Sequence, residues 1–73
     1  MEATDRAKRW AKVNPWFGKN PKATEVAVNI HVRLLKQGVA VESDDYYNKL
    51  YYLLKLAKQL GLLDARVKIR TTR

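Results

Sequence analysis

The side chains that could take part in chemistry are few, and their spacing assembles no catalytic group. His31 is the only histidine and the chain has no cysteine, which excludes both a thiol nucleophile with a histidine base and a zinc site. Asp44 and Asp45 are adjacent, and neighbouring side chains on a helix point about 100° apart. Their carboxylates therefore cannot work as a facing acid–base pair. The sequence predicts a protein that is not an enzyme and has no metal and no cofactor.

The net charge indicates a partner that carries the opposite charge. Fifteen Lys and Arg residues against seven Asp and Glu residues give +8 in only 73 residues. Much of the surplus lies near the ends, because residues 6–22 and residues 66–73 contain no acid. This favours an acidic protein or nucleic acid as partner over a basic surface that serves only solubility. The candidate electrostatic contacts of the second end are Arg66, Lys68, Arg70 and Arg73.

Capping signals and apolar periodicity predict three helices that position these groups. A short helix over residues 5–12 follows Thr4, and a longer one over residues 22–37 follows Asn20-Pro21 and ends at Gly38. A third helix follows Ser43, and Leu60-Gly61-Leu62 is typical of a helix C-terminus. The predicted fold is all-α, one domain over residues 1–63. Residues 64–73 alternate as a strand does but have no second strand to pair with, so they are expected to form a basic, flexible tail.

The helix over residues 22–37 has an apolar surface wider than one-sided packing needs. One stripe, ending at Leu34, is expected to face the core, while His31 at its edge is more typical of a structural residue than of a ligand. A second stripe consists of Val28, Val32 and Leu35. The helix is therefore either flanked on two sides or keeps this second stripe for a partner.

The chain contains two Trp, four Tyr and one Phe residue. Each of these rings could either stabilise the core or bind a partner. Trp16 and Phe17 lie in a loop rich in turn-forming residues, where rings of a small domain usually cover the core; Trp10 favours neither function. Tyr46 and Tyr47 are expected in the core, whereas Tyr51 and Tyr52 fit core packing and the stacking of nucleic-acid bases equally well. The residues kept as candidate partner contacts are Trp10, Trp16, Phe17, Tyr51 and Tyr52.

A DNA-binding helix-turn-helix is disfavoured. The connection between the two longer helices runs from Gly38 to Ser43, longer than the usual turn of such motifs. The helix that follows begins with Asp44 and Asp45, whose charges would repel phosphates.

Residues 14–50 carry a pattern of rare residues in a fixed order. The pattern is Asn14-Pro15-Trp16-Phe17-Gly18, then Thr24, Ala27, Ile30-His31, Leu34 and Gly38, then Ser43-Asp44-Asp45-Tyr46-Tyr47. It resembles a non-enzymatic module that recurs in phage proteins, commonly near their C-termini. Copies of the module usually carry a second acidic position after the loop glycine and end in an Arg-rich helix. Here Lys19-Asn20 and the Leu-rich segment 51–63 take those places.

Together with size and charge, this pattern resembles the small regulators with which lytic phages of plant-pathogenic bacteria bind host RNA polymerase. The resemblance implies contact with the N-terminal region of the largest polymerase subunit, inhibition of initiation and suppression of termination. It also implies a monomer in the cytoplasm of the infected bacterial host. Association with a membrane is not expected, since no apolar run approaches the about 20 residues needed to cross one. The alternative is a small basic protein that binds nucleic acid or forms part of the virion.

Overall fold

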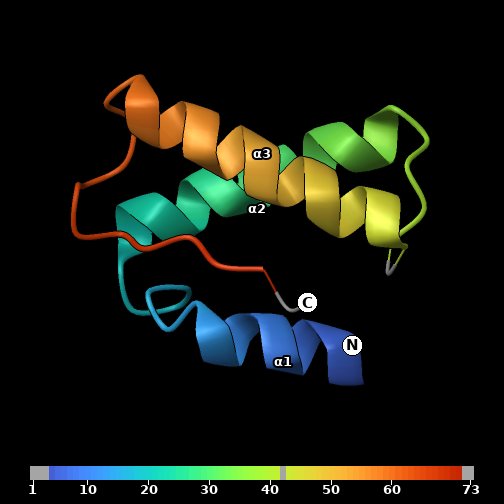
Figure 1. The fold of residues 1–73 in the computed structure, drawn as a ribbon. Coiled ribbons are helices and arrows are strands. Elements are labelled where there is room, and N and C mark those ends of the chain that lie inside the picture. Colours follow the sequence, from blue (N-terminus) through green and yellow to red (C-terminus); the bar gives the residue numbers. More distant parts are fainter. Residues whose placement is uncertain (1–3, 42, 72–73) are drawn as a thin grey trace.

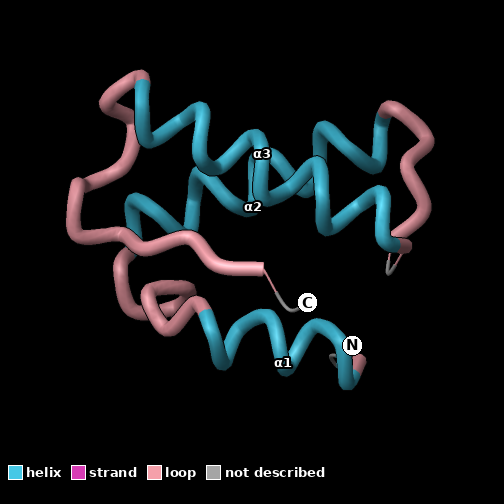
Figure 2. Tube along the Cα trace, viewed as in Figure 1, coloured by secondary structure: helices cyan, strands magenta, loops and turns pink. Residues whose placement is uncertain are grey.

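The computed structural model describes residues 4–41 and 43–71, and it confirms the predicted all-α class. Three helices follow one another along the chain: α1 (Asp5–Val13), α2 (Pro21–Lys36) and α3 (Asp44–Gln59) (Figure 1). The rest of the described chain consists of loops and turns (Figure 2). Each of the three helices begins and ends within one residue of the bounds expected from the sequence.

The helices begin at the predicted capping residues. The side-chain oxygens of Thr4, Asn20 and Ser43 each accept a hydrogen bond from the backbone N–H three residues later, at 3.1, 3.2 and 3.1 Å. Each bond satisfies one of the N–H groups that the first turn of a helix leaves without a partner. These local bonds fix where the helices start.

The two longer helices end in the same left-handed cap. Gly38 has φ of +82°, and the N–H of Val39 donates to the carbonyl of Leu34 at 3.0 Å. Gly61 has φ of +80°, and the N–H of Leu62 donates to the carbonyl of Ala57 at 2.9 Å. This arrangement satisfies the last helical carbonyls and needs a residue that tolerates positive φ.

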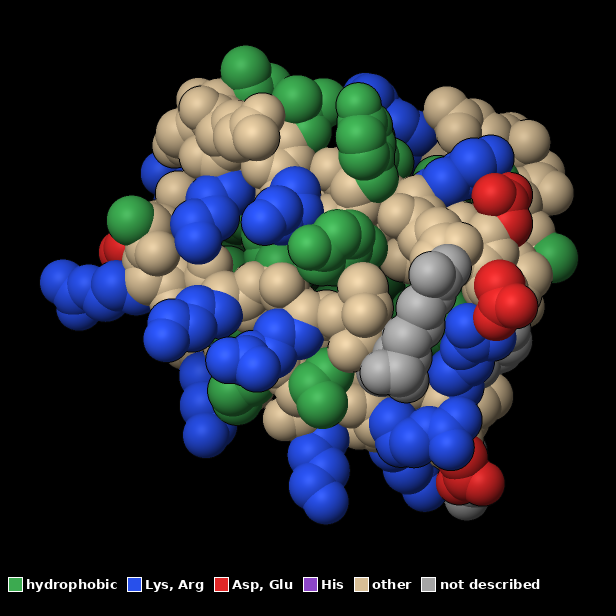
Figure 3. All heavy atoms as spheres, viewed as in Figure 1, with side chains coloured by type: hydrophobic (Ala, Val, Ile, Leu, Met, Phe, Trp, Pro, Cys, Tyr) green, Lys and Arg blue, Asp and Glu red, His purple; other side chains and the backbone are tan. Residues whose placement is uncertain are grey.

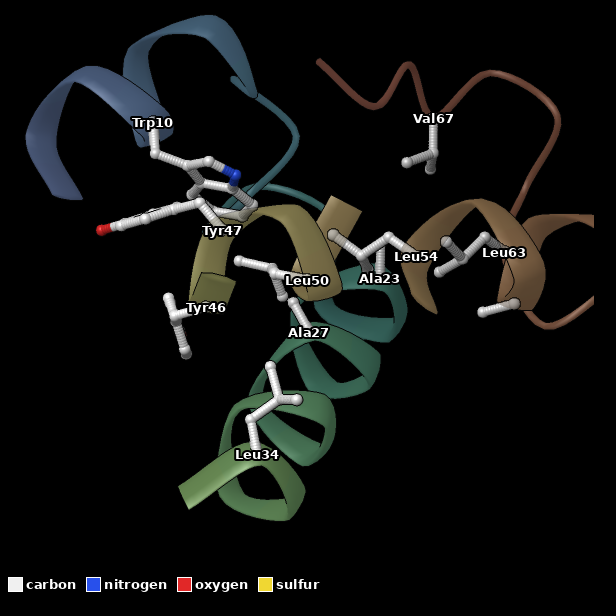
Figure 4. Packing of buried hydrophobic residues seen from close by; sticks show 11 residues of the cluster. Trp10, Ala23, Ala27, Leu34, Tyr46, Tyr47, Leu50, Leu54, Leu63 and Val67 are labelled. Carbon is white, nitrogen blue, oxygen red and sulfur yellow. The ribbon is translucent and has the colours of Figure 1, made fainter. Parts of the chain in front are cut away.

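α2 and α3 pack against each other, and most of the core lies along their contact. Ala23 and Ala27 let the two helices approach closely, while Leu34, Leu50 and Leu54 fill the space between them (Figure 4). The predicted burial of Tyr46 and Tyr47 is also confirmed. The core stripe of α2 expected from the sequence is thus the one that faces α3.

α1 lies apart from the other two helices (Figure 1). Long side chains of α1 make the contacts with them. Trp10 is buried and points from α1 towards α3 (Figure 4). The guanidinium of Arg6 forms an ion pair with Asp44 at 2.6 Å and lies 4.6 Å from the centre of the Tyr47 ring. α1 is therefore docked on the N-terminal half of α3 by one ring and one cation.

The segment expected to form a flexible tail packs against the rest of the molecule over residues 64–71. Val67 is only 2% exposed and joins the core beside Leu54 and Leu63 (Figure 4). The side chain of Asn14, fully buried, donates to the carbonyl of Arg70 at 3.0 Å and accepts from its N–H at 2.9 Å. Trp16 donates from its indole nitrogen to the carbonyl of Lys68 at 2.9 Å.

The physical reason is that a single amide side chain can replace a partner strand. The Asn14 side chain presents a donor and an acceptor side by side, as a peptide group does, so it satisfies both backbone groups of Arg70. Its amide also donates to the carbonyl of Trp10 at 2.9 Å, which ties the segment to the end of α1. Pairing between strands, the contact that the alternating pattern of this segment suggests, is absent from the described residues, and the bonds to Asn14 and Trp16 take its place.

Candidate protein-binding site

A cavity of about 360 Å³ opens between α1 and the pair formed by α2 and α3. Its walls are almost entirely apolar, and residues from all three helices and from both interhelical loops contribute to them. The lining includes Ala7, Trp10 and Ala11 of α1, Phe17 of the first loop, Val28 of α2 and Val41 of the second loop.

The cavity exists because small side chains face one another across a wide gap. Ala7 and Ala11 are one turn apart on the inner face of α1, on either side of Trp10, and Ala27 of α2 also lines the cavity. Long side chains hold α1 away from the other helices, and three methyl groups cannot fill the space that this separation leaves. An open apolar cavity destabilises a small domain, because its walls lose the contacts that close packing would give.

Two polar groups meet at the cavity wall. The hydroxyl of Tyr46 and Nδ1 of His31 are 2.6 Å apart, joined by a hydrogen bond, and their rings are nearly perpendicular. The sequence-based expectation that His31 is structural agrees with this contact, since the bond links α2 to α3. Lys8 is the only lysine or arginine among the described residues that line the cavity, and none of them is Asp or Glu.

The aromatic loop residues pack on Trp10. The ring centres of Trp16 and Phe17 lie 5.8 and 5.3 Å from that of Trp10, both edge to face. Trp16 is partly buried, and Phe17 is 37% exposed at the cavity rim. Both rings therefore cover the core, the arrangement favoured from the sequence, and Phe17 also offers an edge to solvent.

The second stripe of α2 is exposed along its length. Val28, Val32 and Leu35 are between 42% and 45% exposed, although all three are apolar. Val28 also lines the cavity, so the stripe begins at the cavity rim. Of the two tyrosines left undecided, Tyr51 is half-buried with Lys55 5.8 Å from its ring centre, whereas Tyr52 is 68% exposed on α3.

The structure brings the two basic ends of the chain together. The backbone bonds between Asn14 and Arg70 and between Trp16 and Lys68 place residues 66–70 beside the end of α1. Figure 3 shows Lys and Arg side chains over much of this face, while the acidic side chains visible there lie mainly near the N-terminal ends of α1 and α3. Arg73, the last of the predicted electrostatic contacts, lies outside the described residues.

Sequence reasoning did not find the cavity or the Asn14 contact. The only sequence feature that indicated the cavity was the placement of Ala7, Trp10 and Ala11 on one face of a helix. A large ring between two small side chains leaves unfilled space on either side of the ring. Whether a neighbour fills the gaps depends mainly on residues of α2 and α3, which are distant in sequence. The signal for Asn14 was weaker still, since asparagine before proline is also typical of an ordinary turn.

The described residues hold no group of three or more His, Cys, Asp or Glu that could bind a metal ion. Among the same residues, no helix has the length and apolar character to cross a membrane.

Comparison with protein-family models, with curated proteins and with solved structures gave no match for this chain.

Proposed function

We propose that this chain is a phage regulator that binds the RNA polymerase of the host bacterium, inhibits initiation and suppresses termination. The main support for the proposal is the exposed apolar stripe of Val28, Val32 and Leu35 on α2. The stripe begins at the rim of the apolar cavity, and the protein that carries it has a net charge of +8. An unpartnered apolar surface of this kind is typical of a protein interface. Polymerase is proposed as the partner because size, net charge and the pattern of residues 14–50 together resemble the phage regulators that bind it.

Basic charge and apolar surface have different functions in such an interface. The excess of Lys and Arg attracts an acidic partner and raises the rate of encounter, whereas buried apolar side chains hold the complex together. Initiation and readthrough should therefore change together, because both depend on the same docking event.

The test is retention of purified polymerase by the tagged protein, with the enzyme taken from a plant-pathogenic bacterium. The wild-type chain is expected to retain it, and Leu35→Gln should weaken binding about fivefold or more, since truncating an interface anchor commonly has that effect. Leu60→Gln is the matched control, because Leu60 is even more exposed but lies at the end of α3. Absence of polymerase from the wild-type sample contradicts the proposal.

A second candidate function, binding of nucleic acid, is favoured by the convergence of the two basic ends on one face. The salt dependence of binding affinity distinguishes nucleic-acid binding from polymerase binding. Affinity for a short labelled duplex should fall with a log–log slope of about −0.9 per phosphate contact if the basic face binds the backbone. A polymerase complex centred on apolar side chains should depend much less on salt. Tight duplex binding together with no polymerase binding would support the second candidate.

A further inference from the structure

The cavity between α1 and the other two helices offers a binding site of a definite chemistry. Its volume of about 360 Å³ lies at the lower end of the range for ligand pockets, about 300 to 1,000 Å³. Its walls present methyl groups and ring faces, with the bonded pair of His31 and Tyr46 as their main polar feature. Such walls bind a large apolar group and discriminate against a charged one.

The rim of the cavity extends the apolar surface beyond what a small molecule could cover. Phe17, Val28 and Val41 are each between 37% and 45% exposed and all line the cavity. Val28 continues into Val32 and Leu35 along α2. A small ligand would leave this rim in contact with water, whereas a polypeptide that inserts one side chain would cover both cavity and rim.

The charges around the cavity select for an acidic polypeptide. The two carboxylates at the nearby start of α3 each form an ion pair within the chain, Asp44 with Arg6 at 2.6 Å and Asp45 with Lys49 at 3.1 Å. Lys8 lines the cavity and forms no ion pair with any described residue. An incoming carboxylate therefore meets an available ammonium group, while an incoming cation is opposed by the net charge of +8.

We infer that the cavity and its rim bind a large apolar side chain carried by an acidic segment of the partner protein. The inference rests on the proposed function in so far as that partner is RNA polymerase. Beyond that function, it identifies the cavity and its rim as the docking site, and an acidic segment with a large apolar side chain as the part of the partner that binds there.

Peptide binding tests the chemistry without polymerase. The probe is a blocked peptide with one phenylalanine between two pairs of aspartates, added to the ¹⁵N-labelled full chain. Signals of Ala7, Trp10 and Val28 should shift. A peptide with alanine at the centre should bind about tenfold more weakly or worse, because the inserted ring supplies most of the buried area. A peptide with lysines in place of the aspartates should show no binding.

Variants of the protein locate the site. Ala7→Leu fills the cavity from α1 with a residue that favours helix, and it should weaken peptide binding about tenfold or more. Ala65→Leu is the matched control, the same change at an exposed position outside the cavity, and should bind as the wild type does. Lys8→Gln should weaken binding about two- to fivefold, the usual range for an exposed ion pair. Lys22→Gln, exposed and outside the cavity lining, is its control.

A second variant keeps the test valid if Ala7→Leu does not fold. Val28→Gln changes a side chain that is 45% exposed, so it should retain the native helix content and still weaken peptide binding. Equal binding of the phenylalanine peptide by the wild type and by folded Ala7→Leu and Val28→Gln would overturn the inference. Binding of the lysine peptide as strong as that of the aspartate peptide would do so too.

The same variants distinguish this inference from the proposed function. If the wild type and folded Ala7→Leu retain polymerase equally, the cavity is not the docking site, although the polymerase proposal stands. If the wild type binds the peptide at the cavity but retains no polymerase, the chemistry of the site stands and the polymerase proposal is wrong. Concentration-dependent shifts of cavity signals without peptide, abolished in Ala7→Leu, would assign the surface to a second copy of this chain and overturn the inference.

Discussion

The aromatic cluster of Trp10, Trp16 and Phe17 and the apolar stripe of Val28, Val32 and Leu35 are each built from three large apolar side chains, but they differ in how they pack. The rings of the cluster pack edge to face on one another and cover the core. The side chains of the stripe are more than two-fifths exposed. Both regions were candidate partner contacts on sequence grounds. The difference indicates that the large rings of this small domain serve the packing of its core, whereas the smaller aliphatic side chains of the stripe stay exposed.

The largest effect on stability is expected at Trp10. Replacing this buried ring by alanine should reduce the free energy of unfolding by about 3–5 kcal/mol, which is most of the stability that a domain of this size has. Trp10→Ala is therefore expected to lose its cooperative thermal transition in circular dichroism. Phe17→Ala, which removes a ring that is 37% exposed, should lose clearly less. A native-like melting curve for Trp10→Ala would show that α1 does not depend on this ring.

Asn14 fixes the C-terminal segment beside the aromatic cluster, since it bonds both backbone groups of Arg70 while Trp16 of the cluster bonds Lys68. Asn14→Ala removes three hydrogen bonds and should lower the free energy of unfolding by about 2–3 kcal/mol, because each bond contributes about 1 kcal/mol and buried groups lose their partners. Urea unfolding measures the change. Asn29→Ala, an exposed position on α2, is the control and should stay within about 0.5 kcal/mol of the wild type. Equal midpoints for both variants would contradict the role of Asn14.

Gly38 lies beyond the end of the exposed stripe and sets where α2 stops. Gly38→Val should lower the free energy of unfolding by about 1 kcal/mol or more, because a β-branched residue resists its φ of +82°. The space around the position is open, so the effect is one of backbone conformation and not of a clash. Gly38→Asn should lose less, since asparagine tolerates this conformation better. Equal melting temperatures for the valine variant and the wild type would contradict the cap.

The smallest effect on stability is expected in the stripe itself. Leu35→Gln should change the free energy of unfolding by less than about 0.5 kcal/mol, as an exposed substitution that keeps helix propensity. The same variant should nevertheless weaken partner binding more than Phe17→Ala does, when both are compared at a temperature where both are folded. If Leu35→Gln unfolds the domain while binding per folded molecule is unchanged, the roles of the two regions are reversed.

The sequence predicted those parts of the fold that depend on neighbours along the chain. Thr4, Asn20 and Ser43 cap helices through bonds to residues three positions away, and Gly38 closes a turn within its own helix. These interactions need no knowledge of the rest of the molecule, which is why they could be read from residue types alone.

Features that join distant segments could not be predicted in the same way. The bonds between Asn14 and Arg70 span 56 positions. The cavity depends on Ala7 and Val28 lying on elements whose separation only the folded chain sets. For the candidate site, the sequence indicated the exposed stripe but not the cavity from which it starts.

The bond pair between Asn14 and Arg70 has a consequence for the order in which the molecule folds. It closes a loop that contains α2 and α3, and the entropy of closure grows with the length of the loop. Contacts between residues so far apart in sequence are expected to form after the rate-limiting step of folding. By then the packing of α2 on α3 has shortened the effective length of the loop. Weakening the bond pair should therefore leave the refolding rate nearly unchanged and accelerate unfolding. Asn14 would then determine the unfolding rate, and with it the lifetime of the folded state, while the packing of α2 on α3 determines the folding rate.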